Sequence, residues 1–310
     1  MREASAFAPG HITGFFQICD EAYDPLYKGS RGAGASITLG VHTRVRAESS
    51  DQNKYTISFN GKVTDGFFVS ENVLGRMLRR TERRYRIFVD HRLETPLGAG
   101  LGSSGGGALT LALALNEALG LGMSYIEAAR VAHVAEIECK TGLGTVFAAT
   151  EGGFGVLLKP GAPGIGEALK YDRSEDLAIV FLHFGPLSTK EALSNPTLRG
   201  RINELGGRFV NELSRDLKPS AFMELSRRFT DHLGIATPRL RAVLDEAHEA
   251  GIPCTMAMFG EVAFSLVERD EAERVAEFLR GAAPGREVQI ARIDDQGARL
   301  TRREFRVKEV

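Results

Sequence analysis

The stretch PLGAGLGSSGGG, residues 96–107, places six glycines and two adjacent serines immediately before the apolar run ALTLALALNEALG, residues 108–120. Glycines let backbone N–H groups converge on an anion, and the first turn of a helix adds positive partial charge there. Serine hydroxyls in such a turn can reach a phosphate or its metal ion. The stretch therefore predicts an anion-binding loop that leads into a helix over residues 106–119.

Other glycine-rich patterns fit this stretch less well. Gly100, Gly102 and Gly105 satisfy GxGxxG, but the acidic residue that a dinucleotide fold needs about 20 residues on would be Glu127, inside a predicted helix. The lysine of a Walker loop and the downstream motifs of a protein kinase are both missing from the sequence. A tight packing turn without a ligand is the remaining alternative, and the Ser-Ser pair at a helix start argues against it.

Composition limits the kinds of protein that the chain can be. At 310 residues, with 43% hydrophobic and 25% charged residues, it has the length for two globular domains. A net charge of −1 gives no overall attraction to nucleic acid or to an anionic membrane. Three widely spaced cysteines form no disulfide or metal pattern, and no signal-peptide or membrane-spanning run is evident. We therefore expect a cytoplasmic protein without nucleic-acid or membrane partners.

The order of predicted elements is mixed rather than a regular strand–helix alternation. Alternating patterns predict strands, and helical patterns follow, with Ser124 and Glu127 in capping-box spacing at the start of one helix. The predicted strands are 35–47, 54–60, 86–94, 152–159, 177–184 and 288–293, and the segment CTMAMFGEVAFSLV at 254–267 precedes the last predicted helix. The predicted helices are 73–84, 106–119, 125–140, several between 195 and 250, and 270–280. This order indicates an α+β protein with two layers.

The segment KPGAPGIGEA, residues 159–168, concentrates proline and glycine as a linker does. It predicts a boundary between an N-terminal domain, residues 1–165, and a C-terminal domain, residues 166–310.

Four segments together resemble the motifs of the GHMP kinases, which include galactokinase, homoserine kinase, mevalonate kinase and phosphomevalonate kinase. Residues 96–106 resemble the phosphate-binding motif, APGHI at 8–12 the first motif, TGLGTVFAATEGG at 141–153 the substrate-side loop, and AMFGEVAF at 257–264 the third motif. Within that family, PGHITGFF, GSRGAG, KPGAPG and MAMFGEVAF look most like the pantoate kinases of archaeal coenzyme A synthesis.

The resemblance implies a fold and a set of ligands. The fold would be an N-terminal ribosomal-protein-S5-like domain and a C-terminal ferredoxin-like domain, with ATP and Mg²⁺ in the cleft between them. The motif serine that lies on Mg²⁺ and the β,γ-phosphates of relatives corresponds to Ser104. The implied ATP- and phosphate-binding residues are Pro96, Gly98, Gly100, Leu101, Gly102, Ser103, Ser104 and Gly105.

The family also places a Mg²⁺-binding carboxylate on the helix at 125–140, where Glu136 and Glu138 both lie. Glu136 belongs to a polar stripe at spacings of three and four that comprises Arg130, His133, Glu136 and Lys140. We therefore predict Glu136 as the metal ligand beside Ser104, because Mg²⁺ needs few protein oxygens. A solvated stripe without a ligand is the open alternative.

Two positions depart from the pattern of mevalonate kinase-like members. The usual lysine after the first Pro-Gly is His11, as in the pantoate kinase form of the motif, and the usual aspartate after the second helix is Thr145. A loose phosphoryl-transfer transition state depends on positioning and charge neutralisation more than on a strong base. We predict that His11 accepts or orients the hydroxyl proton; a structural loop histidine is the alternative.

A hydroxy-acid acceptor needs a cation for its carboxylate and an apolar wall. Arg31, His133 and Lys28 are the cationic candidates, with Thr145 in the substrate-side loop and Phe15 and Phe16 as the candidate wall.

The resemblance thus implies an ATP-dependent kinase of a small alcohol, with the 4-hydroxyl of pantoate as the expected acceptor and a homodimer left open. A homoserine or mevalonate-type kinase would share the phosphate-loop chemistry. A non-catalytic nucleotide or ligand sensor is the second alternative, to which Thr145 gives some support and against which Ser104 and Glu136 argue.

Overall fold

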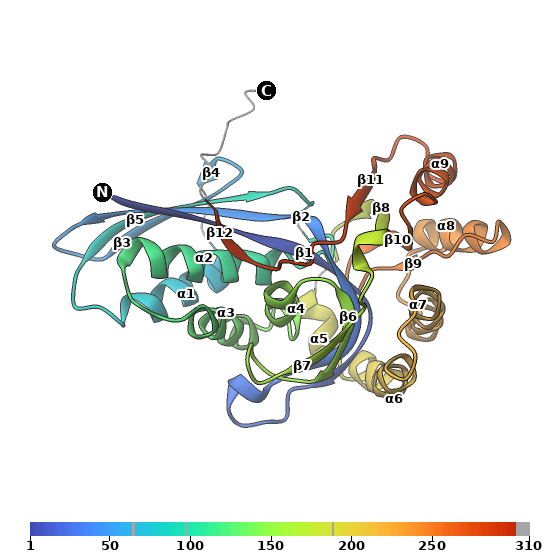
Figure 1. Cartoon of the computed structure of the whole chain (residues 1–310), viewed down its shortest axis with the longest axis horizontal. Coiled ribbons are helices and arrows are strands. Elements are labelled where there is room, and N and C mark those ends of the chain that lie inside the picture. Colours follow the sequence, from blue (N-terminus) through green and yellow to red (C-terminus); the bar gives the residue numbers. More distant parts are fainter. Residues whose placement is uncertain (64–65, 97, 188, 302–310) are drawn as a thin grey trace.

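The computed structural model describes residues 1–63, 66–96, 98–187 and 189–301, and Figure 1 shows two sheets that each carry their own helices. The larger sheet has the strand order β12-β1-β2-β5-β3-β4, with β6 and β7 attached to β2. Its strands are β1 (Arg2–Cys19), β2 (Gly29–Ser49), β3 (Lys54–Phe59), β4 (Lys62–Val63), β5 (Tyr85–Leu93), β6 (Phe154–Lys159), β7 (Glu167–Lys170) and β12 (Arg299–Thr301). Four helices cover one face: α1 (Phe68–Leu78), α2 (Ser103–Leu119), α3 (Tyr125–Cys139) and α4 (Thr145–Glu151).

The smaller sheet is antiparallel, with the order β11-β8-β10-β9. Its strands are β8 (Leu177–Gly185), β9 (Thr255–Met256), β10 (Glu261–Glu268) and β11 (Val288–Arg292). The helices of this half are α5 (Thr189–Ser194), α6 (Pro196–Leu213), α7 (Pro219–Leu233), α8 (Pro238–Glu249) and α9 (Ala272–Ala282). The α+β prediction is confirmed.

Helix α2 is buried along almost its whole length because its sequence alternates Ala and Leu without a polar face. Its N-cap residue is Gly102, whose φ of 76° lies in the left-handed region that glycine adopts at low cost, and no side chain caps the first N–H groups of the helix. The following helix, α3, starts with the predicted capping box between Ser124 and Glu127. The phosphate-binding stretch therefore ends in a helix whose first backbone donors are available to a ligand.

Strand β1 is the longest of the elements that the sequence analysis does not predict. It carries register shifts between Pro9 and Gly10 and between Thr13 and Phe15, and most of its residues are buried on both faces. A strand buried on both faces shows no period-two alternation. It pairs with β2 along nearly its full length, and its C-terminal half packs on α6 and α7.

The two halves share one hydrophobic core rather than a thin interface. Phe15 of β1 lies edge-on to Phe209 of α6, with ring centroids 5.8 Å apart. Phe154 of β6 lies 5.1 Å from Phe222 of α7. Strand β7 and strand β12 both belong to the larger sheet although they follow residue 165 in sequence. The division at 165/166 stays a prediction. In sequence order, strands of the larger sheet occur both before and after this position.

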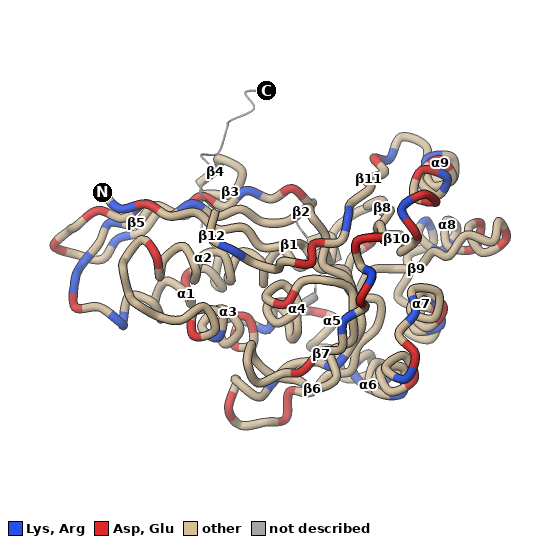
Figure 2. Tube along the Cα trace, viewed as in Figure 1, with Lys and Arg blue, Asp and Glu red and all other residues tan. Residues whose placement is uncertain are grey.

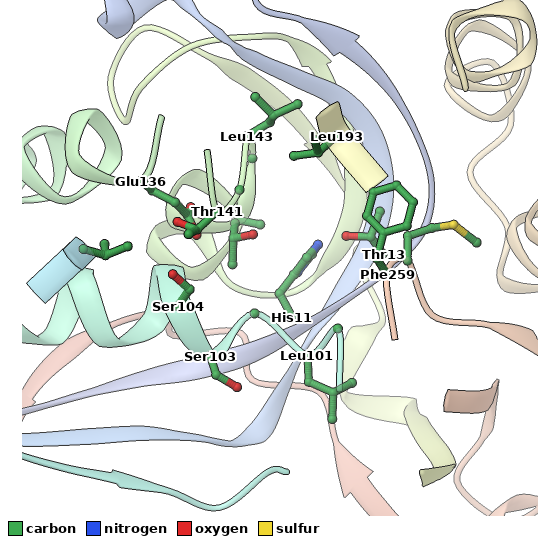
Figure 3. A pocket seen from close by; sticks show the side chains of 18 of the residues that line it. His11, Thr13, Leu101, Ser103, Ser104, Glu136, Thr141, Leu143, Leu193 and Phe259 are labelled. Atoms are coloured by element: carbon green, nitrogen blue, oxygen red, sulfur yellow. The ribbon is translucent and has the colours of Figure 1, made fainter. Parts of the chain in front are cut away.

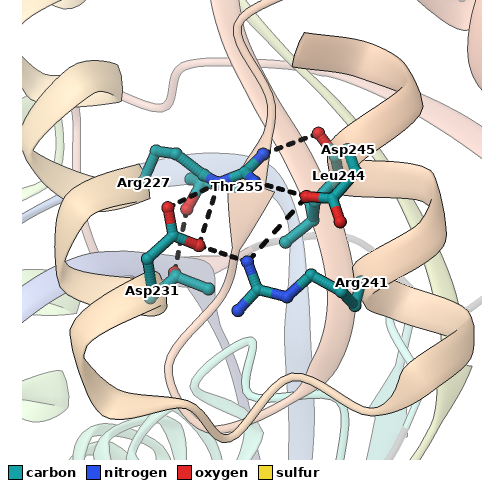
Figure 4. A network of polar contacts seen from close by, with 7 residues as sticks. Arg227, Asp231, Arg241, Leu244, Asp245 and Thr255 are labelled. Atoms are coloured by element: carbon teal, nitrogen blue, oxygen red, sulfur yellow. Dashed lines mark hydrogen bonds and ion pairs between the residues drawn. The ribbon is translucent and has the colours of Figure 1, made fainter. Parts of the chain in front are cut away.

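Charged side chains of both signs are interspersed along the outer elements, as Figure 2 shows for α9. Figure 4 shows one organised group, in which Arg227 of α7 donates to Asp245 at 2.6 Å and to the carbonyl of Leu244 at 2.6 Å. Asp231 of α7 accepts from both Arg227 and Arg241. This group ties α7 to α8. No helix of the described residues has the length and apolar character that crossing a membrane requires.

Candidate active site

A cavity of about 550 Å³ lies where the phosphate-binding stretch, β1, the start of α4 and the turn before β10 meet. Its lining includes Gly98, Gly100, Leu101, Gly102, Ser103 and Ser104 from the phosphate-binding stretch. Pro96 and Gly105 do not line it. Gly105 packs against the Glu136 carboxylate, since a Cβ there would lie 2.9 Å from it. Six of the eight predicted phosphate-loop residues therefore face one space.

The turn that carries the third motif holds this loop from the other side. A Cβ on Gly260 would lie 1.8 Å from the carbonyl oxygen of Ala99, and one on Gly100 would lie 2.6 Å from the backbone nitrogen of Gly260. Gly100 also has a φ of 69°. The two backbones touch without intervening side chains, so glycine is needed on both sides.

Ser104 and Glu136 point toward one another across the cavity, and Thr141 lies beside them, whereas the Ser103 hydroxyl points away (Figure 3). Glu136 is 2% exposed, and burial raises the pKa of its carboxyl to about 7 although the Val146 N–H donates to it. Glycines enclose the carboxylate, since a Cβ on Gly142 would lie 2.5 Å from its Oε1. The structure thus brings together the two predicted metal ligands.

Glu138 lies on the opposite, outer side of α3. Its carboxylate accepts from Arg76 at 2.5 Å and from Asn72 at 3.0 Å, both on α1, and it does not line the cavity. Within the predicted polar stripe His133 and Glu136 are buried, whereas Lys140 at its end is exposed. The choice of Glu136 as the metal ligand stays a prediction.

The donor set at Glu136 fits a hard dication. Among the described residues, no group of three or more His, Cys, Asp or Glu side chains could bind a metal by themselves. One carboxylate and one hydroxyl suit Mg²⁺, which takes its other oxygens from phosphates and water. The buried Thr141 Oγ1 has no hydrogen-bond partner within the described part of the chain, so a further oxygen is available at the same place.

His11 projects into the cavity from β1. Its backbone N–H donates to the carbonyl of Leu101 at 3.0 Å, which ties β1 to the phosphate loop. The Ser36 hydroxyl donates to the carbonyl of Ala148, so it accepts from His11 Nδ1–H at 3.3 Å. Burial lowers the pKa of His11 to about 4, so the ring is neutral and its Nε2 carries a lone pair at neutral pH.

Thr145 is the first residue of α4 and lines the cavity between the phosphate loop and Glu136. Its methyl group lies against both Gly102 and Gly105, where an added Cβ would be only 2.8 and 2.9 Å from it. Thr145 therefore packs under the phosphate loop. The predicted substrate-side loop, residues 141–153, therefore contains the short helix α4, which begins at this residue.

Arg31 and His133 are not brought to the cavity. Arg31 donates to the carbonyl of Leu158 at 2.7 Å and to Asn211 at 2.6 Å, on the far side of β2. His133 is buried, and its Nε2 lies 3.1 Å from the carbonyl of Lys28. Phe15 lies in the shared core, and only Phe16 of the predicted apolar wall reaches the cavity.

The lining contains residues that the sequence analysis does not single out. None of the lining residues in the described part of the chain is Lys or Arg. Hydroxyl, aromatic and aliphatic side chains take their place, namely Thr13, Ser30, Phe59, Phe67, Phe68, Ser70, Leu143, Leu193, Met258 and Phe259. The adjacent Phe67 and Phe68 are the one sequence signal for an aromatic subsite.

The cavity has two chemically different ends on either side of the phosphate loop. At one end Phe59 and Phe67 stack with ring centroids 3.9 Å apart, beside Phe68 and Ser70 at the start of α1. At the other end His11 and Thr13 lie near Phe259 (Figure 3). The first end suits a flat aromatic ring and the second a small alcohol.

Comparisons with known proteins identify relatives of this chain. The family models described as GHMP kinases N terminal domain and GHMP kinases C terminal match residues 70–153 and 210–285. The pantoate kinase of Methanocaldococcus jannaschii is 33% identical over 88% of this chain and 96% of its own. That of Thermococcus kodakarensis is also 33% identical, over 88% and 91% of the two chains. A solved phosphotransferase related to the CoA biosynthesis pathway superposes with a TM-score of 0.87 at 30% identity, covering 97% and 99% of the two chains.

Proposed function

The chain belongs to the GHMP kinase family, and from that membership we propose that it transfers the γ-phosphoryl group of ATP to the 4-hydroxyl of pantoate. The observation that carries the proposal is the convergence of Ser104, Glu136 and the Nε2 of His11 on one cavity. The pantoate kinases among its relatives support the choice of acceptor.

The phosphates of ATP would lie along the backbone N–H groups of the glycine loop and the uncapped start of α2. Ser104 and Glu136 would hold Mg²⁺, with Thr141 beside them. When bound, the ion neutralises charge that develops on the phosphate oxygens. Phe59 and Phe67 would bind the adenine ring by stacking.

The acceptor would lie at the end of the cavity formed by β1. Its hydroxyl can donate a hydrogen bond to the neutral Nε2 of His11, which orients the oxygen for attack. An imidazole with a pKa near 4 is a weak base, which suits a transition state that depends on positioning. The hydroxyls of Thr13 and Ser30 offer donors for the carboxylate, and Phe16 offers an apolar wall for the methyl groups.

Magnesium, ATP as the phosphoryl donor and a cytoplasmic location are parts of the same proposal. An ADP-release assay tests it across pantoate, homoserine, mevalonate and shikimate, with MgATP as donor. We expect turnover with pantoate to exceed that with the other three alcohols by at least an order of magnitude in kcat/KM. Preferred turnover of homoserine or mevalonate would assign a different acceptor. Binding of ATP without turnover of any alcohol would favour a ligand sensor.

A further inference from the structure

A chain of buried hydrogen bonds runs from the aromatic end of the cavity into the larger sheet. His91 of β5 is fully buried; its Nε2 lies 3.2 Å from Ser70 Oγ, and its Nδ1 lies 2.7 Å from Thr43 Oγ1. Thr43 Oγ1 lies 2.5 Å from Thr110 Oγ1 of α2. All four residues are buried, and Ser70 is the member that lines the cavity.

One set of donor directions satisfies every contact in this chain, and it follows from the inner end. Thr110 Oγ1 lies 2.9 and 3.1 Å from the carbonyl oxygens of Gly106 and Gly107, which can only accept, so the Thr110 hydroxyl donates its one hydrogen to them. Thr43 must then donate to Thr110 and accept from His91 Nδ1–H. The bare Nε2 of His91 therefore accepts from the Ser70 hydroxyl.

This direction is the same throughout the neutral pH range. Burial lowers the pKa of His91 to about 3, so its ring stays neutral and Nε2 stays an acceptor. The only hydrogen of the Ser70 hydroxyl is used inside the protein, and its oxygen offers the cavity lone pairs alone. Ser70 is thus a hydrogen-bond acceptor toward any ligand.

The place of Ser70 indicates which part of a nucleotide it would meet. It lies in the first turn of α1, directly after Phe67, Phe68 and Val69, which all line the cavity. Phe67 stacks on Phe59, whose ring also lies 4.6 Å from that of His91. The same histidine therefore supports the aromatic surface and sets the direction of the Ser70 hydroxyl.

We propose that Ser70 accepts a hydrogen bond from the exocyclic amino group of the nucleobase, and that His91 is the positioning residue that keeps Ser70 an acceptor. The subsite then selects a 6-amino purine against a 6-oxo purine, whose carbonyl would face the lone pairs of Ser70. This inference rests on the proposed function only for the placing of the base at the aromatic end.

Binding of ATP, inosine triphosphate and 2′-deoxy-ATP, measured by calorimetry with Mg²⁺ and without an acceptor alcohol, tests the proposal. ATP and inosine triphosphate differ at the purine 6-position and its neighbouring nitrogen. We expect the wild-type protein to bind ATP at least tenfold more tightly than inosine triphosphate, and Ser70→Ala to reduce that ratio about tenfold. The matched control is Ser58→Ala, because the Ser58 hydroxyl bonds to Asp90 on the same sheet and does not line the cavity.

Thr43→Val tests the positioning role of His91, since it removes the acceptor of Nδ1–H while keeping the side-chain shape. We expect the ratio to fall, whereas a merely structural loss would weaken both nucleotides alike. An unchanged ratio in Ser70→Ala, or equal binding of both nucleotides by the wild-type protein, would overturn the proposal. So would a Ser70→Ala variant that loses only its discrimination against 2′-deoxy-ATP, because the contact would then be with the sugar.

The failures of the two proposals are distinguishable. Nucleotide discrimination without turnover of any alcohol would overturn the acceptor assignment and leave the role of Ser70 standing. Turnover of pantoate with an unchanged nucleotide ratio in Ser70→Ala would do the reverse. Absence of binding of either nucleotide would overturn both.

Discussion

The hydroxyl of Ser104 and the carboxylate of Glu136 reach the same space from two helices that follow each other in the chain. Ser104 belongs to the first turn of α2, where the backbone donors have no intrahelical partner. Glu136 lies on the buried face of α3. When the Glu136 carboxyl is ionised, its negative charge lies in a low-dielectric setting, and a bound dication would offset the cost of burying that charge.

Ser104→Ala should remove a preorganised contact to the metal and phosphates. We expect kcat to fall about a hundredfold or more, by analogy with loss of one electrostatic donor in other active sites. Ser103→Ala is the matched control, since that hydroxyl points away from Glu136 and should cost less. Steady-state kinetics on folded variants decides, and near-normal turnover of Ser104→Ala would remove Ser104 from the catalytic group.

Glu136→Gln should raise the Mg²⁺ concentration needed for half-maximal activity and lower the maximal rate strongly, because an amide is a poorer ligand for a hard dication. Glu138→Gln changes the same group on the outer side of α3, where its partners are Arg76 and Asn72. We expect it to leave the Mg²⁺ titration unchanged. The reverse pattern would place the metal on the outer side of the helix.

The stability of the metal-free protein should depend on pH through Glu136. Its carboxyl has an ordinary pKa of 4.5 and a pKa raised by burial to about 7 in the folded chain, so the native state binds the proton more tightly. The contribution to the free energy of unfolding therefore falls as pH rises from 4.5 to 7, by up to about 3 kcal/mol.

Denaturant unfolding between pH 5 and pH 8 measures this dependence. Glu136→Gln should abolish that part of the pH slope, and Mg²⁺ with ATP should stabilise the wild-type protein most at the upper end of the range. An identical slope in the wild-type and Gln proteins would contradict the raised pKa.

At the scale of elements, the site is assembled from backbone contacts. The turn before β10 touches the phosphate loop through Gly260 and Gly100, and α4 contacts the same loop through the methyl group of Thr145. A side chain larger than hydrogen at Gly100 or Gly260, or one larger than the methyl group at Thr145, would separate these elements. The phosphate loop is therefore shaped by neighbours from both halves of the chain.

Thr145→Asp tests whether a carboxylate at the start of α4 would act as a base. The new charge would lie beside Gly105, against which the Glu136 carboxylate also packs, and close to bound phosphates. We expect kcat to stay level or fall, because like charges oppose one another at this distance. Thr145→Asn controls for shape, and a Thr145→Asp enzyme many times faster than the natural one would sink the mechanism without a carboxylate base.

Elements with a strong local signal could be predicted, and those that depend on distant contacts could not. The apolar run of α2 and the capping box of α3 determine those helices locally. Helix α1 starts at Phe68 rather than at the predicted residue 73, since an uncapped start has no sequence signal. Strand β1 was missed because it is buried on both faces and broken by two bulges.

The same reasoning accounts for the candidate site. Ser104, Glu136 and His11 lie in motifs or on a periodic helix, so the sequence predicts them, and the structure brings them to one cavity. The prediction that Arg31 binds the acceptor rests on its glycine-rich neighbourhood alone. Strand β2 begins before it at Gly29, and the alternation of that strand turns Ser30 and Gly32 to the cavity and Arg31 away. Ser70 and His91 meet only through tertiary packing.

At the scale of the whole molecule, the two sheets depend on each other. Residues of β1, β2 and β6 share a core with β8, β10 and helices α6 to α9. Strands β7 and β12, which follow residue 165, complete the larger sheet. The protein should therefore unfold as one cooperative unit.

Expression of residues 1–165 alone tests that dependence. The fragment would lack β7 and β12 and expose Phe15 and Phe154, which pack on helices of the other half. We expect poor dispersion in its NMR spectrum and no cooperative thermal transition, whereas the full chain should show a single calorimetric transition. A stable, cooperatively folded fragment would show that the core of the first half is sufficient by itself.

The pairing of Ser5 with Thr301 has a consequence for synthesis of the protein. The ribosome releases β1 well before β12, and the outer edge of β1 at residues 5–7 finds β12 only after residue 301 has emerged. Until then a strand edge with unpaired N–H and C=O groups is open to other chains. Nascent chains crowded on one messenger RNA are therefore at greatest risk of edge-to-edge association through this strand.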